Sequence, residues 1–148
     1  VETGVRLRYH GKDADTGEAV EFLIENMETR SQLMNRENAM RILKSKLYQR
    51  ELDKRMALFK KRLHGYSFVL EQRSMHVWLE LPHGWTSTAF EQAAQRVGLQ
   101  VYSSEKFTVG HMPPPNCVRL AISSPHTMQI FRQGLDLLVG VLEGGCET

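Results

Sequence analysis

The densest group of chemically active side chains in this sequence is a basic tract between Arg30 and Arg62. It holds eleven Lys and Arg residues against three acidic ones, a net charge of +8 in a chain whose formal charge is +2. The remainder is therefore net acidic, at −6. Cationic side chains along one helix can neutralise RNA phosphates, and a solvated helix face is the alternative. The candidate RNA contacts are Arg36, Arg41, Lys44 and Lys46.

The other residues that could do chemistry form no known catalytic or metal-binding pattern. The six histidines show no HExxH or other ligand spacing, and Cys117 and Cys146 form no CxxC pair. No GxSxG, Walker loop or GxGxxG occurs. We therefore expect no catalytic residue and no metal site. Two distant cysteines favour a reducing compartment.

The overall composition is that of a water-soluble protein. The hydrophobic fraction is 41% and the charged fraction is 24%. No apolar run approaches the roughly 20 residues that cross a bilayer, so we expect no membrane partner. The first eleven residues carry charges throughout and do not resemble a signal peptide. The expected location is the cytoplasm or an organellar stroma or matrix.

A hairpin and a long helix are expected to position the basic tract. Residues 5–9 and 19–24 alternate apolar and polar side chains, as half-buried strands do, and a polar turn from Gly11 to Gly17 joins them. A helical pattern then begins near Asn35, and no Gly or Pro interrupts residues 36–63. One helical face carries Met40, Leu43 and Leu47, and a second carries Leu52, Met56, Phe59 and Leu63.

The step of five residues between these two apolar stripes puts them out of phase. A helix that continues through the step would be roughly 40 Å long, more than one small domain can cover. We expect one continuous helix over 36–63 that self-associates through its apolar stripe, because exposed Leu and Met would otherwise face water. A bend at the phase change is the alternative.

The second half of the chain alternates predicted strands and helices. Strands are expected over 75–81, 99–102 and 117–122, with a Pro-rich loop over 112–115. Thr86 or Ser87 can cap a helix that turns Phe90, Ala93, Ala94 and Val97 inward. Ser124-Pro125 predicts the start of the last helix, and Gly144-Gly145 its end. The apolar stripe of that helix is Met128, Phe131, Leu135, Leu138 and Leu142.

Residues from about 58 to 142 resemble the small C-terminal domain of fold-type I pyridoxal-phosphate aminotransferases, in particular that of MocR-type regulators. The segments that carry the resemblance are Met75-His-Val-Trp-Leu-Glu-Leu-Pro82, Phe90-Glu-Gln-Ala-Ala-Gln-Arg-Val-Gly98, Val101-Tyr-Ser-Ser-Glu-Lys-Phe107 and Val118-Arg-Leu-Ala-Ile-Ser123. The resemblance implies a β-α-β-β-α domain in which Arg119 binds a substrate carboxylate. The alternative for Arg119 is a structural ion pair.

The cofactor-holding parts of that family have no counterpart in this sequence. The family's Schiff-base lysine, pyridinium-binding aspartate and phosphate loop cannot be assigned. Lys106 does not lie in the family's lysine motif, so we reject it as a Schiff-base residue. We therefore expect no bound cofactor.

Residues from about 5 to 55 resemble a different family, the class I peptide chain release factors. The resemblance rests on Gly4-Val-Arg-Leu7, Thr16-Gly17 and Thr29-Arg-Ser-Gln-Leu-Met-Asn-Arg-Glu-Asn-Ala-Met40, continuing to Lys46-Leu-Tyr48. In that family this unit follows the Gly-Gly-Gln loop that triggers hydrolysis of peptidyl-tRNA. The tripeptide occurs nowhere in these 148 residues. The resemblance implies contact with ribosomal RNA without hydrolysis. For Tyr48, packing against a neighbouring element is favoured over stacking on an RNA base.

Two unrelated resemblances in one chain lead to the main expectation. We expect an α+β protein with a release-factor-like hairpin and long basic helix over 1–56 and an α/β-type aminotransferase-like small domain over 57–148. A chimeric or shuffled protein without catalytic activity of its own is the leading interpretation. The alternatives are a ribosome- or RNA-binding module, and an aminotransferase-like fragment that needs a partner chain.

Overall fold

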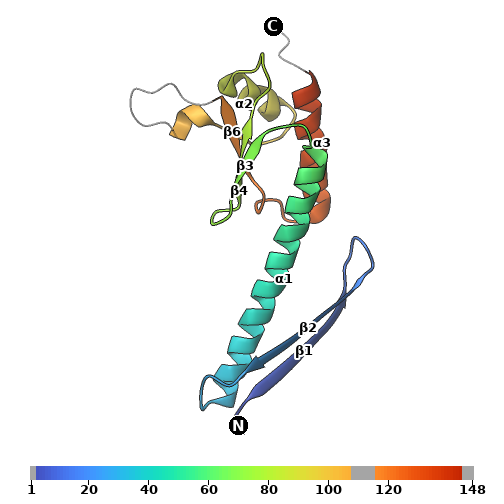
Figure 1. The fold of residues 1–148 in the computed structure, drawn as a ribbon, viewed down its shortest axis with the longest axis vertical. Helices are drawn as coiled ribbons and strands as arrows, with labels where there is room; N and C mark the ends of the chain where they lie inside the picture. Colours follow the sequence, from blue (N-terminus) through green and yellow to red (C-terminus); the bar gives the residue numbers. More distant parts are fainter. Residues whose placement is uncertain (1–2, 108–115, 145–148) are drawn as a thin grey trace. The chain divides into compact units, whose positions relative to one another are not determined.

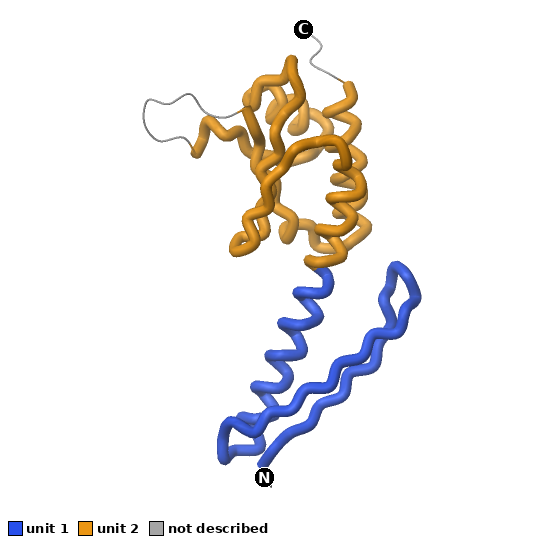
Figure 2. The backbone as a smooth tube through the Cα atoms, viewed as in Figure 1, with its two compact units in different colours: residues 1–51 blue, residues 52–148 orange. Residues whose placement is uncertain are grey.

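A computed structural model describes residues 3–107 and 116–144 of the chain (Figure 1). The chain contains both α-helices and antiparallel β-sheets, which confirms the α+β class. The chain divides into two compact units, residues 1–51 (unit 1) and residues 52–148 (unit 2) (Figure 2). The expected boundary at 56/57 was placed by resemblance rather than by compactness and stays a prediction. None of the helices in the described residues is long and apolar enough to cross a membrane.

Unit 1 begins with a two-stranded antiparallel hairpin. Strand β1 (Val5–Lys12) pairs with β2 (Ala19–Asn26), from Val5 opposite Asn26 to Lys12 opposite Ala19. The alternation in the sequence predicted both strands, and each extends two or three residues further than expected. The outward face is charged, and Arg6 pairs with Glu25 at 2.8 Å across the hairpin.

One buried aspartate organises the turn of the hairpin. The Oδ1 atom of Asp13 accepts hydrogen bonds from the backbone N–H groups of Asp15 and Thr16, at 2.8 and 3.2 Å. Its Oδ2 atom binds Nη2 of Arg50 at 2.9 Å. Gly17 has a φ of 74°, a backbone conformation that costs glycine nothing. The acidic turn is therefore held by a basic residue of the helix in the same unit.

Helix α1 (Gln32–Arg62) is helical without interruption, as the absence of Gly and Pro predicted. Within unit 1 its buried residues Ala39 and Leu43 join Ile24 of β2 in a small apolar cluster. The prediction for Met40 was wrong, since its side chain is 39% exposed. The side of the helix that faces the hairpin is centred on Ala39 instead. A helix turns about 100° per residue, so the next residue, Met40, points away from the hairpin.

Unit 2 is built on a four-stranded antiparallel sheet in the order β3-β4-β6-β5. The strands are β3 (Phe68–Glu71), β4 (His76–Glu80), β5 (Tyr102–Ser103) and β6 (Cys117–Ala121). The predicted order β-α-β-β-α omitted β3, which is only four residues long and pairs across a tight turn with β4. Strand β5 begins three residues later than expected.

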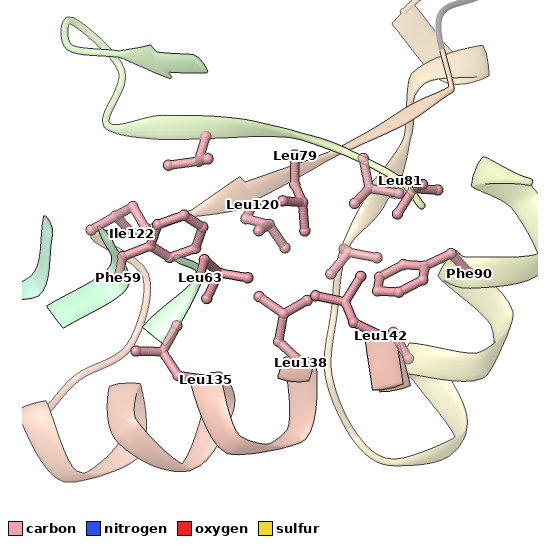
Figure 3. Packing of buried hydrophobic residues seen from close by; sticks show 14 of the residues in the cluster. Phe59, Leu63, Leu79, Leu81, Phe90, Leu120, Ile122, Leu135, Leu138 and Leu142 are labelled. Carbon is pink, nitrogen blue, oxygen red and sulfur yellow. The ribbon is translucent and has the colours of Figure 1, made fainter. Parts of the chain in front are cut away.

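Helices cover one face of this sheet. Helix α2 (Ser87–Arg96), helix α3 (Met128–Gly144) and the last turns of α1 pack on the side chains of β4 and β6 that point inward. Figure 3 shows this core, to which each of these elements contributes. The predicted stripes of α1 (Leu52, Met56, Phe59, Leu63) and α3 (Met128, Phe131, Leu135, Leu138, Leu142) are buried throughout.

Some expectations for the helices and loops of unit 2 are corrected by the structure, and others concern residues that it does not describe. Thr86, one of the two predicted caps, is the N-cap of α2. The prediction that Val97 points inward was wrong: Val97 follows the last helical residue and is 44% exposed. Helix α3 starts at Met128 rather than at Ser124-Pro125, since Thr127 supplies its cap by accepting from the N–H of Ile130 at 3.1 Å. The Pro-rich loop 112–115 and Gly145 lie outside the described residues.

Candidate functional site

A buried asparagine sets the position of the basic helix in unit 1. Asn35 is fully buried, and its Oδ1 atom accepts from the N–H and Oγ1 of Thr29 at 3.0 and 2.9 Å. Its Nδ2 atom donates to the carbonyls of Thr3 and Thr29 at 2.8 and 3.0 Å. These four bonds satisfy the side-chain amide and tie the start of the hairpin to the first turns of α1. Part of the segment that carries the release-factor resemblance therefore has a structural role, because it joins the hairpin to the helix.

The four predicted RNA contacts are all exposed but do not lie together. Lys46 turns toward the hairpin, and its Nζ lies 6.0 Å from the centroid of the Phe22 ring. Arg41 and Lys44 lie three residues apart on one side of the helix, and Arg41 donates to Oδ1 of Asn38 at 3.1 Å. Arg36 lies between these two sides. Arg41 and Lys44 are therefore the two that lie close together, and the RNA-contact role of the four residues stays a prediction.

Tyr48 lies on the same side of α1 as Arg41 and Lys44. Its side chain is 57% exposed, so the expectation that it packs a helix is wrong within unit 1. Leu33 and Met34 are also exposed, at 65% and 52%. The outward side of this helix segment therefore mixes cationic and apolar groups. Self-association was expected through the apolar stripe of residues 36–63, but most of that stripe is buried within the chain, so exposed Leu and Met of the stripe do not require it. Self-association itself stays a prediction.

Several other basic residues of the tract have structural partners. Arg55 is 5% exposed, donates from Nη1 to the carbonyl of Ile122 at 3.0 Å and lies 5.6 Å from the Phe131 ring. Arg62 forms an ion pair with Asp136. In unit 1, Arg50 is held by Asp13. The formal charge of the tract consequently overstates the charge that it offers to a ligand.

Arg119 lies on the face of the sheet opposite the helices. Its neighbours in register are Trp78 on β4 and Tyr102 on β5. Its guanidinium carbon lies 4.1 Å from the centroid of the Phe107 ring and 5.6 Å from that of Tyr102. The ring of Trp78 meets Phe107 edge to face at 5.4 Å. Arg119 is thus held by aromatic rings through cation–π attraction.

The alternative of a structural ion pair for Arg119 finds no carboxylate partner among residues 3–107 and 116–144. Its Nε atom is buried and has no hydrogen-bond partner among these residues. A guanidinium suits a carboxylate, because it offers two parallel N–H donors. The carboxylate-binding role implied by the resemblance stays a prediction.

Lys106, which was rejected as a Schiff-base residue, has a structural partner in unit 2. Lys106 lies in a short 3₁₀ turn (Ser104–Phe107) and forms an ion pair with Glu91 at 2.5 Å. The backbone N–H of Ser103 donates to the same carboxylate at 2.6 Å. Burial alone would raise the pKa of Glu91, but Lys106 and the N–H of Ser103 together hold it below its usual value. Lys106 is therefore a structural partner.

Metal and thiol chemistry find no support among the residues that the structure describes. No group of three His, Cys, Asp or Glu side chains there could hold a metal ion. Burial raises the pKa of the Cys117 thiol, and Glu80 adds to the rise, while a hydrogen bond with Ser104 opposes it. A thiol with a raised pKa is a poor nucleophile at neutral pH.

Sequence reasoning missed two features of these sites. Asn35 was noticed only as part of a motif, because one of its partners, Thr3, lies 32 residues away in the sequence. The aromatic rings around Arg119 were also missed. Their signal was available for Trp78, since it alternates with the buried Val77 and Leu79 and so faces the other side of the strand.

Comparison with known proteins gives partial matches. No protein-family model matches the chain. A segment of 90 residues is 33% identical to YdeF of Bacillus subtilis, described as an uncharacterized HTH-type transcriptional regulator, and covers 61% of this chain and 20% of the regulator. A segment of 54 residues is 50% identical to peptide chain release factor 1 of Bacteroides fragilis, covering 36% of this chain and 15% of the factor.

A solved structure adds a likeness of fold. An archaeal alanine:glyoxylate aminotransferase superposes with a TM-score of 0.53 and 19% identity, over 66% of this chain and 24% of that one. At this identity the likeness shows the fold alone. The chain spans a fifth or less of the curated relatives that it matches. The chain is therefore similar to part of a release factor, part of a regulator and part of an aminotransferase fold.

Proposed function

We propose that the chain is a composite protein without catalytic activity of its own, and that unit 1 binds RNA of the ribosomal kind. The observation that carries the proposal is the pair Arg41 and Lys44, exposed on one side of α1 in the part of the chain that resembles release factors. Release factor 1 is named for peptide chain release, an event on the ribosome. The attraction would come from phosphates, which cationic side chains bind without reading sequence.

The charge balance of the helix supports this reading. The part of α1 within unit 1, residues 32–51, carries five basic and two acidic residues, a net of +3. Arg50 and Lys46 are engaged with Asp13 and Phe22. Lys44 has no ion-pair partner among the described residues. Lys44 is therefore available to a phosphate, and Arg41 needs only to leave the neutral Asn38.

The experiment is a titration of a fluorescent ribosomal RNA hairpin with the full chain at several salt concentrations. We expect affinity to fall with salt, and a variant with both Arg41→Ala and Lys44→Ala to lower the slope of log affinity against log salt by about 1 to 2. The matched control carries Arg73→Ala and Arg96→Ala, which remove the same charge from exposed positions of unit 2. Equal losses in both variants would mean nonspecific attraction and would overturn the proposal.

The absence of catalysis is tested separately. The sequence lacks a Gly-Gly-Gln loop, and Lys106 is occupied by Glu91. We expect no release of peptide from peptidyl-tRNA on ribosomes and no transamination with added pyridoxal phosphate. A borohydride-reducible adduct at one lysine, in stoichiometric yield, would contradict this.

A second candidate function rests on Arg119. Its guanidinium, stacked on Phe107 and paired with no described carboxylate, would suit an aminotransferase-like subunit whose pyridoxal site comes from a partner chain. The test measures binding of a small dicarboxylate such as succinate by calorimetry, with Arg119→Lys as the variant. Because Lys cannot give two parallel donors, we expect at least tenfold weaker binding. Unchanged binding would remove this candidate.

A further inference from the structure

We infer that unit 1 binds unpaired nucleotides, with the Tyr48 ring stacked on a base while Arg41 and Lys44 hold neighbouring phosphates. The inference rests on the proposed function and specifies the kind of RNA that the same surface takes. It concerns a side chain whose exposure the sequence alone did not indicate.

The two tyrosines of unit 1 have opposite environments. Tyr9 is half-buried on β1 and packs against Phe22 with ring centroids 6.3 Å apart. Tyr48 is 57% exposed and does not belong to the apolar cluster of the unit. The small core of unit 1 therefore makes no use of the Tyr48 ring. Tyr48 is instead exposed on the side of the helix that carries Arg41 and Lys44.

The spacing of the three side chains fits a strand of nucleic acid. Lys44 lies one helical turn before Tyr48, and Arg41 lies two turns before it. At 1.5 Å per residue the seven positions from Arg41 to Tyr48 span about 10 Å. A base on the ring and phosphates on the two cations would thus run along the helix axis. Proteins that bind single strands combine cationic side chains and stacking aromatic rings in this way.

An aromatic ring favours unpaired nucleotides for a geometric reason. Inside a duplex, both faces of each base are covered by neighbouring bases, so an exposed tyrosine gains no stacking surface. In a loop, bulge or single strand, a base can turn out and lie against the ring. Arg41 and Lys44 alone would bind any phosphate backbone. Tyr48 would therefore supply the preference for unpaired segments.

A second copy of the chain is the competing occupant of this surface. Leu33, Met40 and Tyr48 could pair with their counterparts, but this would also bring together the exposed Arg41 and Lys44 of both copies. Like charges at short range oppose such a dimer, whereas a polyanion satisfies them. Two acidic residues lie on this side as well: Glu51 has an interaction of its own, and Glu37 offsets one of the two cations, so an excess of positive charge remains. Charge complementarity favours RNA.

The test compares a labelled single-stranded RNA of 12 nucleotides with a fully paired hairpin of the same composition. Fluorescence anisotropy is recorded with the full chain over a series of salt concentrations. We expect tighter binding of the single strand. Tyr48→Ala should weaken that binding by about 5- to 150-fold, which is the range for loss of one base–aromatic stack. Tyr48→Phe, which keeps the ring, should stay within about twofold of the parent.

Matched variants separate stacking from general loss of surface. Leu33→Ala removes an exposed apolar side chain from the same helix and should change binding by less than about twofold. None of these uncharged changes should alter the salt slope, because they remove no phosphate contact. Circular dichroism confirms that each variant remains folded.

Each outcome decides between the inference and its alternatives. If the Arg41 and Lys44 double variant loses affinity while Tyr48→Ala does not, the proposed function stands and this inference fails. If the chain binds neither RNA, both fail. If Tyr48→Ala leaves RNA binding intact but turns a dimer into a monomer in sedimentation, the second copy is the occupant and the inference is wrong.

Discussion

Unit 1 and unit 2 are held together in different ways. In unit 2, eighteen buried apolar side chains from the sheet and its helices form one cluster, counted over the described residues. In unit 1 the corresponding cluster has three, and three further buried positions are polar: Asp13, Asn26 and Asn35. A chain of 51 residues buries a smaller share of its surface than one of 97, so hydrogen bonds must hold more of its geometry.

This difference suggests a division between stability and binding. Unit 2 hides most of its large apolar side chains, and Arg55 and Arg62 of the basic tract serve its packing. Unit 1 leaves Leu33, Met34 and Tyr48 exposed beside its cations. A surface that a protein leaves apolar and charged at once is a candidate for contact with a partner. Four predictions test this difference between the two units.

The largest effect is expected from the core of unit 2. Phe59 is 1% exposed and meets Phe68 edge to face at 5.0 Å. Phe59→Ala should lower the free energy of unfolding by about 3–5 kcal/mol, through lost burial and the cavity left behind. Urea denaturation measures the loss, and the exposed Lys60→Ala on the same helix should stay within about 0.5 kcal/mol. A loss below about 1 kcal/mol would show that the cluster does not dominate unit 2.

The next effect belongs to the corner of unit 1. Asn35→Ala removes four hydrogen bonds and leaves the buried groups of Thr29 and Thr3 unpaired, which should cost about 2–3 kcal/mol. Amide hydrogen exchange should accelerate in β1 and β2 and remain unchanged in β4 and β6. Asn38→Ala, three residues further, is the control and should have little effect. Acceleration in both units would contradict the proposed separation.

A matched pair of helix caps compares the units directly. The side-chain oxygen of Ser31 in unit 1 accepts from the N–H of Met34, and that of Thr86 in unit 2 accepts from the N–H of Ala89, both at 3.2 Å. Ser31→Ala and Thr86→Ala should each cost about 1 kcal/mol. Hydrogen exchange should rise about fivefold in the unit that carries the change. If Thr86→Ala disturbed unit 1 as strongly, the two units would unfold together.

The smallest effect is electrostatic and depends on pH. The pKa of Glu91 is lowered, so its contribution to stability is present above the ordinary carboxylate pKa and is lost as the pH falls through the lowered value. The partner Lys106 is half exposed, which limits the contribution to less than about 1 kcal/mol. Glu91→Gln should remove this part of the acid dependence. The measurement compares urea midpoints at pH 6 and pH 3, and identical profiles in parent and variant would exclude the ion pair as a contributor.

Local periodicity predicted most of the elements. The alternation in 5–9 and 19–24 identified both strands of the hairpin, and the stripe from Met128 to Leu142 identified the buried face of α3. Such patterns predict an element reliably because a continuous apolar face is buried in the fold, whichever element packs against it. The short β3 had too few residues to show a period. Met40 was misassigned because only three apolar positions defined the first stripe of α1.

The sequence by itself determined the α+β class, the unbroken helix and the apolar faces of unit 2, because these depend on residues within a few positions of each other. Only the tertiary structure decided which charges are available. Arg55 is buried against Ile122, 67 residues away, and Arg50 meets Asp13, 37 residues away, while Arg41 and Lys44 remain exposed. All four look alike in the sequence. Their difference arises from distant partners that the fold brings near, which no local pattern records.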